Sequence, residues 1–161
     1  MAKKRIFTHD DQQQKDYARE ARLQYGPDLV NESNARWNGY TELQRDAIRE
    51  EGDEIYNDLA DALTAGKDPL SAEVQDMLVR WHDHIRYFYE PTLDILRGLG
   101  EMYVMSPDFR ATFEKLHPEL PEYLQTGIIE YVDDLETEAI RRMLAEDAGD
   151  GDADVLRRLS G

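Results

Sequence analysis

The sequence predicts an all-α domain, and three observations support that prediction. Apolar residues recur every three or four positions over most of the 161-residue chain, which is the spacing of one helix face. No segment shows the strict alternation of apolar and polar residues that marks a half-buried strand. Proline and glycine steps interrupt the periodic runs at short intervals. A chain of this length suits one domain with one core.

The first half of the chain predicts four helices. The first begins at a Thr cap and ends at a Gly-Pro step, over residues 8–26. The second is short and polar, from 30 to 37, and an Asn-Gly turn follows it. The third, 41–66, opens with a Thr-x-x-Gln capping box that satisfies exposed N–H groups. The fourth starts at a Ser cap and carries a stripe of apolar residues at helical spacing: Val74, Met77, Leu78, Trp81, Ile85 and Phe88.

The second half predicts three more helices and a tail. Pro91 interrupts the chain, and a helix then runs to about Tyr103. A Ser-Pro cap at 106–107 opens a short helix, and the last long helix keeps its periodicity to Leu144. We expect residues 16–146 to form the domain, with a flexible segment at 1–15. The acidic, glycine-rich tail at 147–161 is typical of disorder.

Composition excludes several classes of partner. The formal net charge is −16, whereas phosphate binding needs a basic stripe, so direct contact with nucleic acid is not expected. The same charge disfavours an anionic membrane surface. No apolar run approaches the roughly 18 residues of a membrane span, and the N-terminus lacks the pattern of a secretory signal. The sequence therefore predicts a cytoplasmic protein.

The sequence offers little for catalysis or metal binding. His82 and His84 would point about 200° apart on a helix and could not share one ion. Cysteine is absent, and no catalytic triad or phosphate loop is present. Four carboxylates on one helix face are interpreted as solvated: Glu50, Glu54, Asp58 and Asp61. We expect no metal, no cofactor and no enzyme activity, with a haem protein or an enzyme as a remote alternative.

Aromatic and glycine residues say more about a possible binding site. Tyr87, Phe88 and Tyr89 are consecutive, so on a helix they cover about 200° and cannot all face one core. At least one of them faces solvent, a second element or a ligand. Gly98 and Gly100 each cost about 1 kcal/mol in a helix relative to Ala. Close helix packing and close approach of a ligand are the two explanations that remain open.

At "GLGEMYVMSPDF", with "HIRYFYEP" before it, the sequence resembles the TipAS antibiotic-recognition domain. The resemblance covers about residues 16–132. It implies a globin-like helical domain with a deep cleft for a bulky antibiotic, typically a thiopeptide. Such domains act as effector-binding parts of MerR-type transcription activators, or alone as drug-sequestering proteins. We therefore expect a drug-sensing or drug-sequestering domain, with an effector module of a MerR-type regulator as the alternative.

Three departures from the family bear on these expectations. No MerR-type winged helix precedes the domain in this sequence. Gly98 stands where the thiostrepton-binding member has a ligand-bonding cysteine, so binding here would be reversible. The spacing from histidine to tyrosine ahead of "EP" is also shorter than in the family. The expected partner is an antibiotic-like small molecule, and a homodimer or a regulatory partner is also considered. The candidate ligand-binding residues are Trp37, Tyr40, Trp81, His84, Tyr87, Phe88, Tyr89, Leu96, Leu99, Gly100, Met102 and Tyr103.

Overall fold

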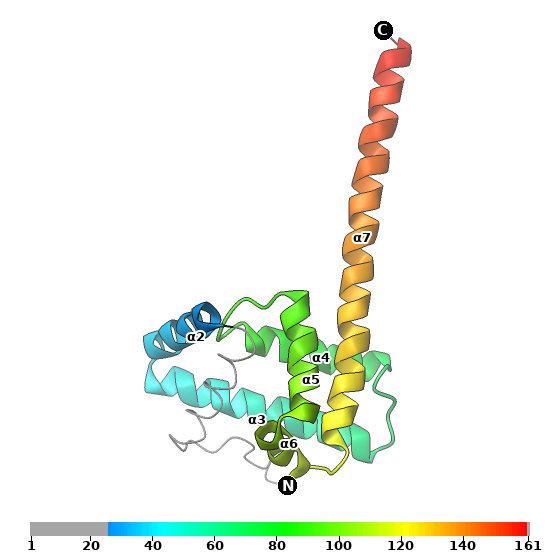
Figure 1. The fold of residues 1–161 in the computed structure, drawn as a ribbon. Helices are drawn as coiled ribbons and strands as arrows, with labels where there is room; N and C mark the ends of the chain where they lie inside the picture. Colours follow the sequence, from blue (N-terminus) through cyan, green and yellow to red (C-terminus); the bar gives the residue numbers. More distant parts are fainter. Residues whose placement is uncertain (1–25, 161) are drawn as a thin grey trace.

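The computed structural model describes the backbone of residues 26–160 and the side chains of residues 26–147. This part of the chain is helical and contains no strand, which confirms the all-α prediction (Figure 1). The helix expected after residue 8 lies outside the described residues. The observed helices are α2 (Pro27–Gly39), α3 (Glu42–Thr64), α4 (Ala72–Ile85), α5 (Leu93–Met105), α6 (Pro107–Glu114) and α7 (Leu120–Ser160).

Side-chain caps set the helix starts that the sequence predicts. Thr41 and Gln44 form the capping box of α3, with both reciprocal hydrogen bonds present. At α4, α5 and α6 a hydroxyl oxygen accepts a hydrogen bond from the backbone N–H three residues later. Those caps are Ser71, Thr92 and Ser106. In α6, Pro107 follows the cap, where its missing N–H costs nothing.

Helix α4 ends earlier than the apolar stripe indicates. It stops at Ile85, and Phe88 lies in the following turn rather than on the helix. The N–H groups of Tyr87 and Phe88 donate to the carbonyls of His84 and Ile85 in short turn bonds. The chain approaches Pro91 here, and a proline disfavours helical geometry in the residue before it. The expected aromatic helix is therefore an aromatic turn.

Helix α2 is longer than the sequence indicates. It begins at Pro27, because proline fits the first turn of a helix. The Asn38-Gly39 step, which predicts a turn, belongs to the last turn of the helix. Val30 is the one buried residue of α2, so this helix adds little to the hydrophobic core.

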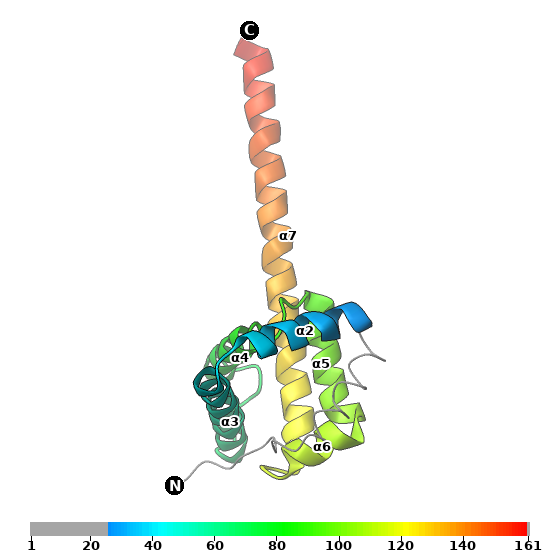
Figure 2. The same cartoon turned by 90° about the vertical axis from the view of Figure 1, so that its left-hand side faces the viewer.

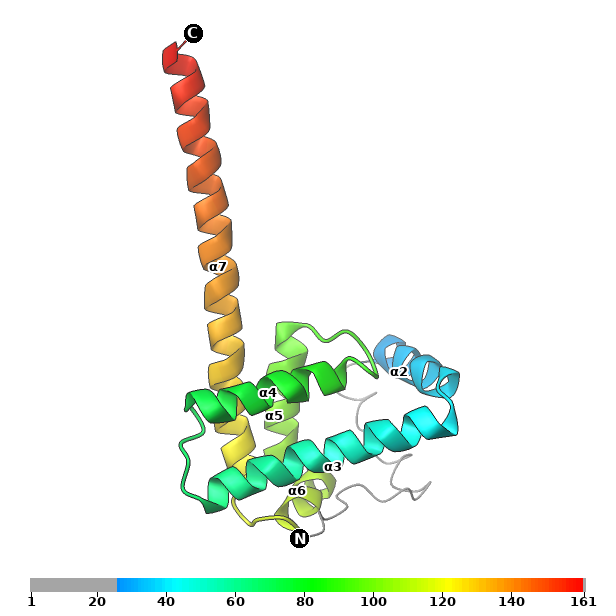
Figure 3. The ribbon, with the colours of Figure 1, turned by 180° about the vertical axis from the view of Figure 1, so that it is seen from behind.

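The core lies between two helix pairs. Helices α3 and α4 lie across α5 and the first part of α7 (Figures 1 and 3), and α5 packs chiefly on α7. Four fully or almost fully buried rings, which we call the buried aromatic core, fill the centre: Tyr56, Trp81, Tyr103 and Phe113. The Trp81 ring N–H donates to the Tyr103 hydroxyl at 3.3 Å. That hydroxyl is 3.4 Å from the Tyr56 hydroxyl.

Gly100 allows α5 to approach α7 closely. A Cβ at this position would lie 3.3 Å from Cγ2 of Ile128 on α7, and Gly100 itself is buried. Ile128 has no exposed surface. Between the two explanations for the glycine, the structure favours close helix packing at position 100.

Helix α7 continues far beyond the rest of the described molecule (Figures 1 and 2). It runs through the acidic stretch from 147 onward to Ser160, where the sequence predicted a disordered tail. The sequence contains no proline after Pro121. Gly149 and Gly151 each cost about 1 kcal/mol relative to Ala without breaking the hydrogen-bond ladder. None of the helices in the described part is long and apolar enough to cross a membrane.

Candidate functional site: an aromatic corner

Five rings meet where α2 passes the end of α4. Trp37 and Tyr40 come from the end of α2, His84 from the last turn of α4, and Tyr87 and Phe88 from the turn after it. We call this group the aromatic corner. Figure 2 shows α2 crossing this end of the molecule, beside α4 and α5. The corner thus joins the end of α2 to the turn after α4; Tyr40 and Tyr87, for example, are 47 residues apart in the sequence.

Trp37 is at the centre of the corner. Its ring stacks on Phe88 with centroids 5.7 Å apart and an interplanar angle of 21°, and Tyr40 meets it edge-on at 6.3 Å. The guanidinium groups of Arg45 and Arg49 lie 5.7 and 5.1 Å from the ring centroid, within cation–π range. The Trp37 side chain remains half-buried.

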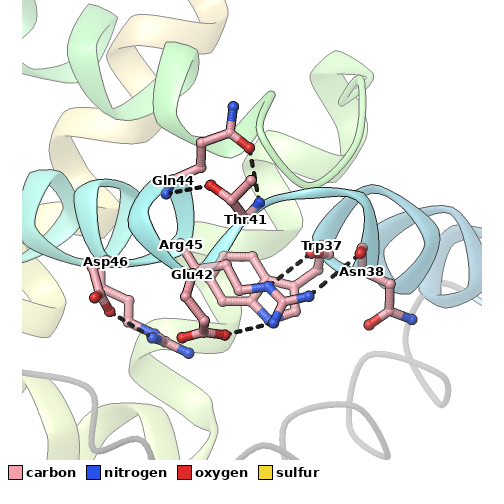
Figure 4. Close-up of polar contacts among 8 residues, drawn as sticks. Trp37, Asn38, Thr41, Glu42, Gln44, Arg45 and Asp46 are labelled. Atoms are coloured by element: carbon pink, nitrogen blue, oxygen red, sulfur yellow. Dashed lines mark hydrogen bonds and ion pairs between the residues drawn. The ribbon is translucent and has the colours of Figure 1, made fainter.

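Arg45 fixes the corner between α2 and α3. Its Nε donates to the Trp37 carbonyl at 3.1 Å, and one terminal nitrogen donates to the Asn38 carbonyl at 3.4 Å. The other terminal nitrogen pairs with Glu42 at 2.7 Å (Figure 4). These bonds add partners to carbonyls in the last turn of α2, where the hydrogen-bond ladder of the helix ends.

Two further hydrogen bonds attach α2 to the turn after α4. The Tyr40 hydroxyl donates to the Tyr87 carbonyl at 2.7 Å. Arg36 donates to the Arg86 carbonyl at 2.7 Å. Because α2 buries only Val30, these polar contacts and the Trp37 stack supply most of its described attachment to α4 and its turn.

His84 joins the corner to α3. Its ring is 7% exposed and lies edge-on to both Tyr87 and Phe88, with centroids 5.8 Å away in each case. Its Nδ1 is 3.2 Å from a Glu51 carboxylate oxygen. Its Nε2 lies only 3.0 Å from where a Cβ of Gly52 would be. The glycine in the middle of α3 therefore makes room for the imidazole.

Burial and Glu51 set the protonation of these groups. Burial lowers the pKa of His84 below its usual 6.5, although the Glu51 carboxylate opposes the shift. Glu51 is also the chief cause of a raised pKa at Tyr87, whose hydroxyl lies 3.5 Å from that carboxylate. At neutral pH the corner therefore presents a neutral imidazole and a neutral phenol beside one carboxylate.

The structure divides the twelve candidate residues into two groups. Five of them form the aromatic corner, where Trp37 and Tyr40 lie with the Tyr87–Phe88 rings. Tyr89 is half-buried and packs against the core. The other six are buried in the interior and do not join the corner: Trp81, Leu96, Leu99, Gly100, Met102 and Tyr103. Their location in the core reflects the packing of α4 and α5 against α3 and α7.

Sequence reasoning missed the contribution of α3. Glu51 and Gly52 hold His84, and Arg49 covers Trp37. A signal for this was present, because a glycine in the middle of a strong helix pattern indicates close approach of another group. Among the described residues, no group of three or more His, Cys, Asp or Glu side chains is placed to hold a metal ion.

Comparison with known proteins places the described helical domain in a class of recognition domains. The TipAS antibiotic-recognition domain family matches residues 17–131. The chain belongs to this family, as the resemblance of the Gly-Leu-Gly-Glu-Met-Tyr-Val run predicts.

Two curated relatives are similar to parts of this chain. The HTH-type transcriptional activator mta of Bacillus subtilis is 35% identical over 124 residues, which cover 76% of this chain and 48% of the relative. The HTH-type transcriptional regulator SkgA of Caulobacter vibrioides is 36% identical over 83 residues, or 50% of this chain and 32% of the relative. No solved structure matches.

The chain thus spans about half or less of the length of these relatives. Neither the family nor the relatives are described as enzymes, in agreement with the prediction that the chain is not one.

Proposed function

We propose that this chain is the effector-binding module of a MerR-type transcription regulator and that it binds a bulky, amphipathic, antibiotic-like small molecule at the aromatic corner. The observation that carries the proposal is the half-buried Trp37, stacked on Phe88 at the end of α2, a helix that buries only Val30. The family membership and the two HTH-type relatives support the regulatory role.

The corner has the composition of a small-molecule site. Stacked and edge-on rings offer apolar area, and a few polar groups at its rim can fix the orientation of a ligand. Those groups are the Tyr40 and Tyr87 hydroxyls and the Glu51 carboxylate. Tyr87 is 37% exposed, so a ligand can reach the rings from solvent.

Capture by this chain is reversible. The sequence has no cysteine, so no thiolate is available to add to an electrophilic ligand. The six buried candidate residues act as the rigid support of the corner rather than as direct contacts. With its net charge of −16, the module leaves DNA contact to a separate part of a regulator and acts in the cytoplasm.

A thermal-shift screen against a panel of natural-product antibiotics tests the proposal. A ligand at 100 times its dissociation constant adds about 2.7 kcal/mol of stability, which gives a clear rise in melting temperature. Trp37→Ala should remove that rise, because it deletes the central ring. Tyr123→Phe is the control, because it removes only the hydrogen bond from the Tyr123 hydroxyl to the Lys67 carbonyl, outside the corner. This variant should retain the rise in melting temperature. An equal rise in the wild type and in Trp37→Ala would place the site elsewhere.

A further inference from the structure

Glu51 places a carboxylate beside the aromatic corner. Its side chain is 40% exposed, and one of its oxygens lies 3.2 Å from Nδ1 of His84. The other oxygen lies 3.5 Å from the Tyr87 hydroxyl. In the described part of the chain, no lysine or arginine forms an ion pair with this carboxylate. The carboxylate is thus partly open to solvent and is held by two aromatic side chains.

Neither of these side chains neutralises the charge of Glu51. Burial lowers the pKa of His84 below its usual 6.5, so the imidazole is uncharged at neutral pH. A neutral imidazole can share a hydrogen bond with a carboxylate, but it supplies no positive charge. The Tyr87 phenol is also neutral, because Glu51 raises its pKa. Both side chains therefore orient the carboxylate oxygens and leave the negative charge in place.

Four arginines described near the corner have acidic partners of their own. The pairs are Arg36–Glu32, Arg45–Glu42, Arg49–Asp46 and Arg86–Asp83. Arg49 and Glu51 are two positions apart on α3, so their side chains point about 200° apart around the helix. The Arg49 guanidinium accordingly lies at Trp37, whereas the Glu51 carboxylate lies at Tyr87.

The rings of the corner are suited to a positive charge. An aromatic ring attracts a cation to its face, as the guanidinium groups over Trp37 illustrate. Tyr87 has 37% of its surface exposed, and among the described residues no arginine or lysine lies over its ring. Tyr87 and Glu51 together therefore offer a ring and a carboxylate to a cation that arrives from solution.

The charge of the whole chain favours the approach of a cation. The formal net charge is −16, and a negative field raises both the local concentration of cations and their rate of association. The same field disfavours an anionic ligand. Long-range attraction does not select one site, so a fixed charge at the site has to do so. Glu51 supplies that charge in contact with two rings of the corner.

We propose that the ligand of the aromatic corner carries a protonated amine, which pairs with the Glu51 carboxylate beside the Tyr87 ring. The apolar body of the ligand then lies against the rings of Trp37 and Phe88. This inference rests on the proposed function and narrows its ligand class from amphipathic compounds in general to cationic ones. Glu51 is the residue that sets this preference for charge.

A series of small naphthalene compounds tests the charge preference. The probes are 2-naphthylmethylamine, 2-naphthylmethanol and 2-naphthoate, which share one apolar body and are cationic, neutral and anionic at neutral pH. Binding at millimolar concentration is followed by the NMR signal of the Trp37 indole N–H, which Trp37→Phe assigns. The wild type should bind the amine about tenfold more tightly than the alcohol, and the anion should bind most weakly.

Glu51→Gln should bring the affinity for the amine down to that for the alcohol. Glutamine keeps an oxygen that can accept hydrogen bonds from His84 and Tyr87 but carries no charge, so the affinity for the alcohol should not change. Near-ultraviolet circular dichroism checks that the variant is folded.

Glu50→Gln is the matched control. It removes the same charge at the neighbouring position of α3, where the side chain is exposed, so the preference for the amine should remain. Equal affinities of the wild type for the amine and the alcohol would overturn the inference. An equal loss of preference in Glu50→Gln and Glu51→Gln would also overturn it, because the long-range field would then be the cause.

Failure of this inference is distinguishable from failure of the proposed function. If the probes shift the Trp37 signal with no preference for charge, the corner binds ligands but Glu51 does not select a cation. If no probe shifts that signal, and Trp37→Ala keeps the melting-temperature rise given by an antibiotic of the panel, the corner is not the site. That second result contradicts both proposals.

Discussion

The buried aromatic core and the aromatic corner contain the same kinds of side chain in opposite environments. Tyr103 and Trp81 are almost fully buried; the Trp81 ring N–H donates to the Tyr103 hydroxyl, and that hydroxyl lies 3.4 Å from the Tyr56 hydroxyl. Trp37 and Tyr87 keep part of their surface in water, and the hydroxyl of Tyr40 bonds to backbone. The core rings stabilise the domain, whereas Trp37 and Tyr87 are partly open to solvent, where we propose that a ligand binds.

The pKa values of the tyrosines differ between the two regions in their physical cause. Burial raises the pKa of Tyr56 to about 12 and that of Tyr103 well above its usual value. At Tyr87 the chief cause is instead the neighbouring Glu51 carboxylate. A specific charge therefore has the largest effect on the pKa of Tyr87, whereas exclusion of water has the largest effect on the pKa of the two core tyrosines.

Truncation of a core ring should give the largest loss of stability. Phe113 has no exposed surface and packs on Tyr103 with centroids 4.7 Å apart. Phe113→Ala should lower the free energy of unfolding by about 3–5 kcal/mol, because it removes buried area and leaves a cavity. Denaturant titration followed by circular dichroism measures this. A loss near 1 kcal/mol would mean that the core closes over the gap.

Truncation of a corner ring should separate binding from stability. Trp37→Ala removes a half-buried ring, so the expected loss of unfolding free energy is about 1–2 kcal/mol, below that of a core ring. Ligand affinity should fall by tenfold or more, because the central stacking surface is gone. Isothermal titration calorimetry with a ligand from the screen measures the affinity. Unchanged affinity with a large loss of stability would assign Trp37 to the core.

Two hydroxyl deletions offer a matched comparison of smaller size. The Tyr40 hydroxyl donates to the Tyr87 carbonyl at 2.7 Å, and the Tyr123 hydroxyl donates to the Lys67 carbonyl at 2.9 Å. Each Tyr→Phe change should cost about 1 kcal/mol. Only Tyr40→Phe should speed hydrogen exchange in α2, because that bond attaches α2 to the turn after α4. Equal exchange rates in both variants would show that the Tyr40 bond does not hold α2.

Much of this fold follows from local rules in the sequence. The capping box at Thr41 and the caps at Ser71, Thr92 and Ser106 are contained in a few neighbouring residues, so they can be recognised from the sequence. Helix ends that depend on later residues are harder to predict. The apolar stripe reaches Phe88, but α4 ends at Ile85 as the chain approaches Pro91.

The candidate site was harder to predict than the fold. Periodicity indicates that a residue such as Trp81 or Tyr103 lies on the apolar face of its helix. It does not show whether that face packs in the core or lines a binding surface. Both residues proved to be buried. The contact of His84 with Gly52 and Glu51 joins residues more than thirty positions apart, and only the packing of α3 against α4 reveals it.

The smallest expected effect is the pH dependence of stability that comes from His84, the buried member of the aromatic corner. Burial is the chief cause of the lowered pKa of His84, and the Glu51 carboxylate partly offsets it. The unfolded chain, with a histidine pKa near 6.5, then binds more protons than the folded chain as the pH falls. The neutral imidazole therefore contributes to the free energy of unfolding above pH 6.5, and this contribution is lost as the pH falls below 6.5.

His84→Gln isolates this contribution, since glutamine can still hydrogen-bond to Glu51 but does not titrate. Between pH 7 and pH 5 the melting temperature of the wild type should fall more steeply than that of His84→Gln. His82 also has a pKa lowered by burial, and its ring bonds to Tyr131 at 2.8 Å, away from the corner. His82→Gln should therefore flatten the stability profile without changing how ligand affinity depends on pH, whereas His84→Gln should change both. If His82→Gln changed the pH dependence of ligand affinity and His84→Gln did not, protonation of His84 would affect only the stability of the fold and not binding at the corner.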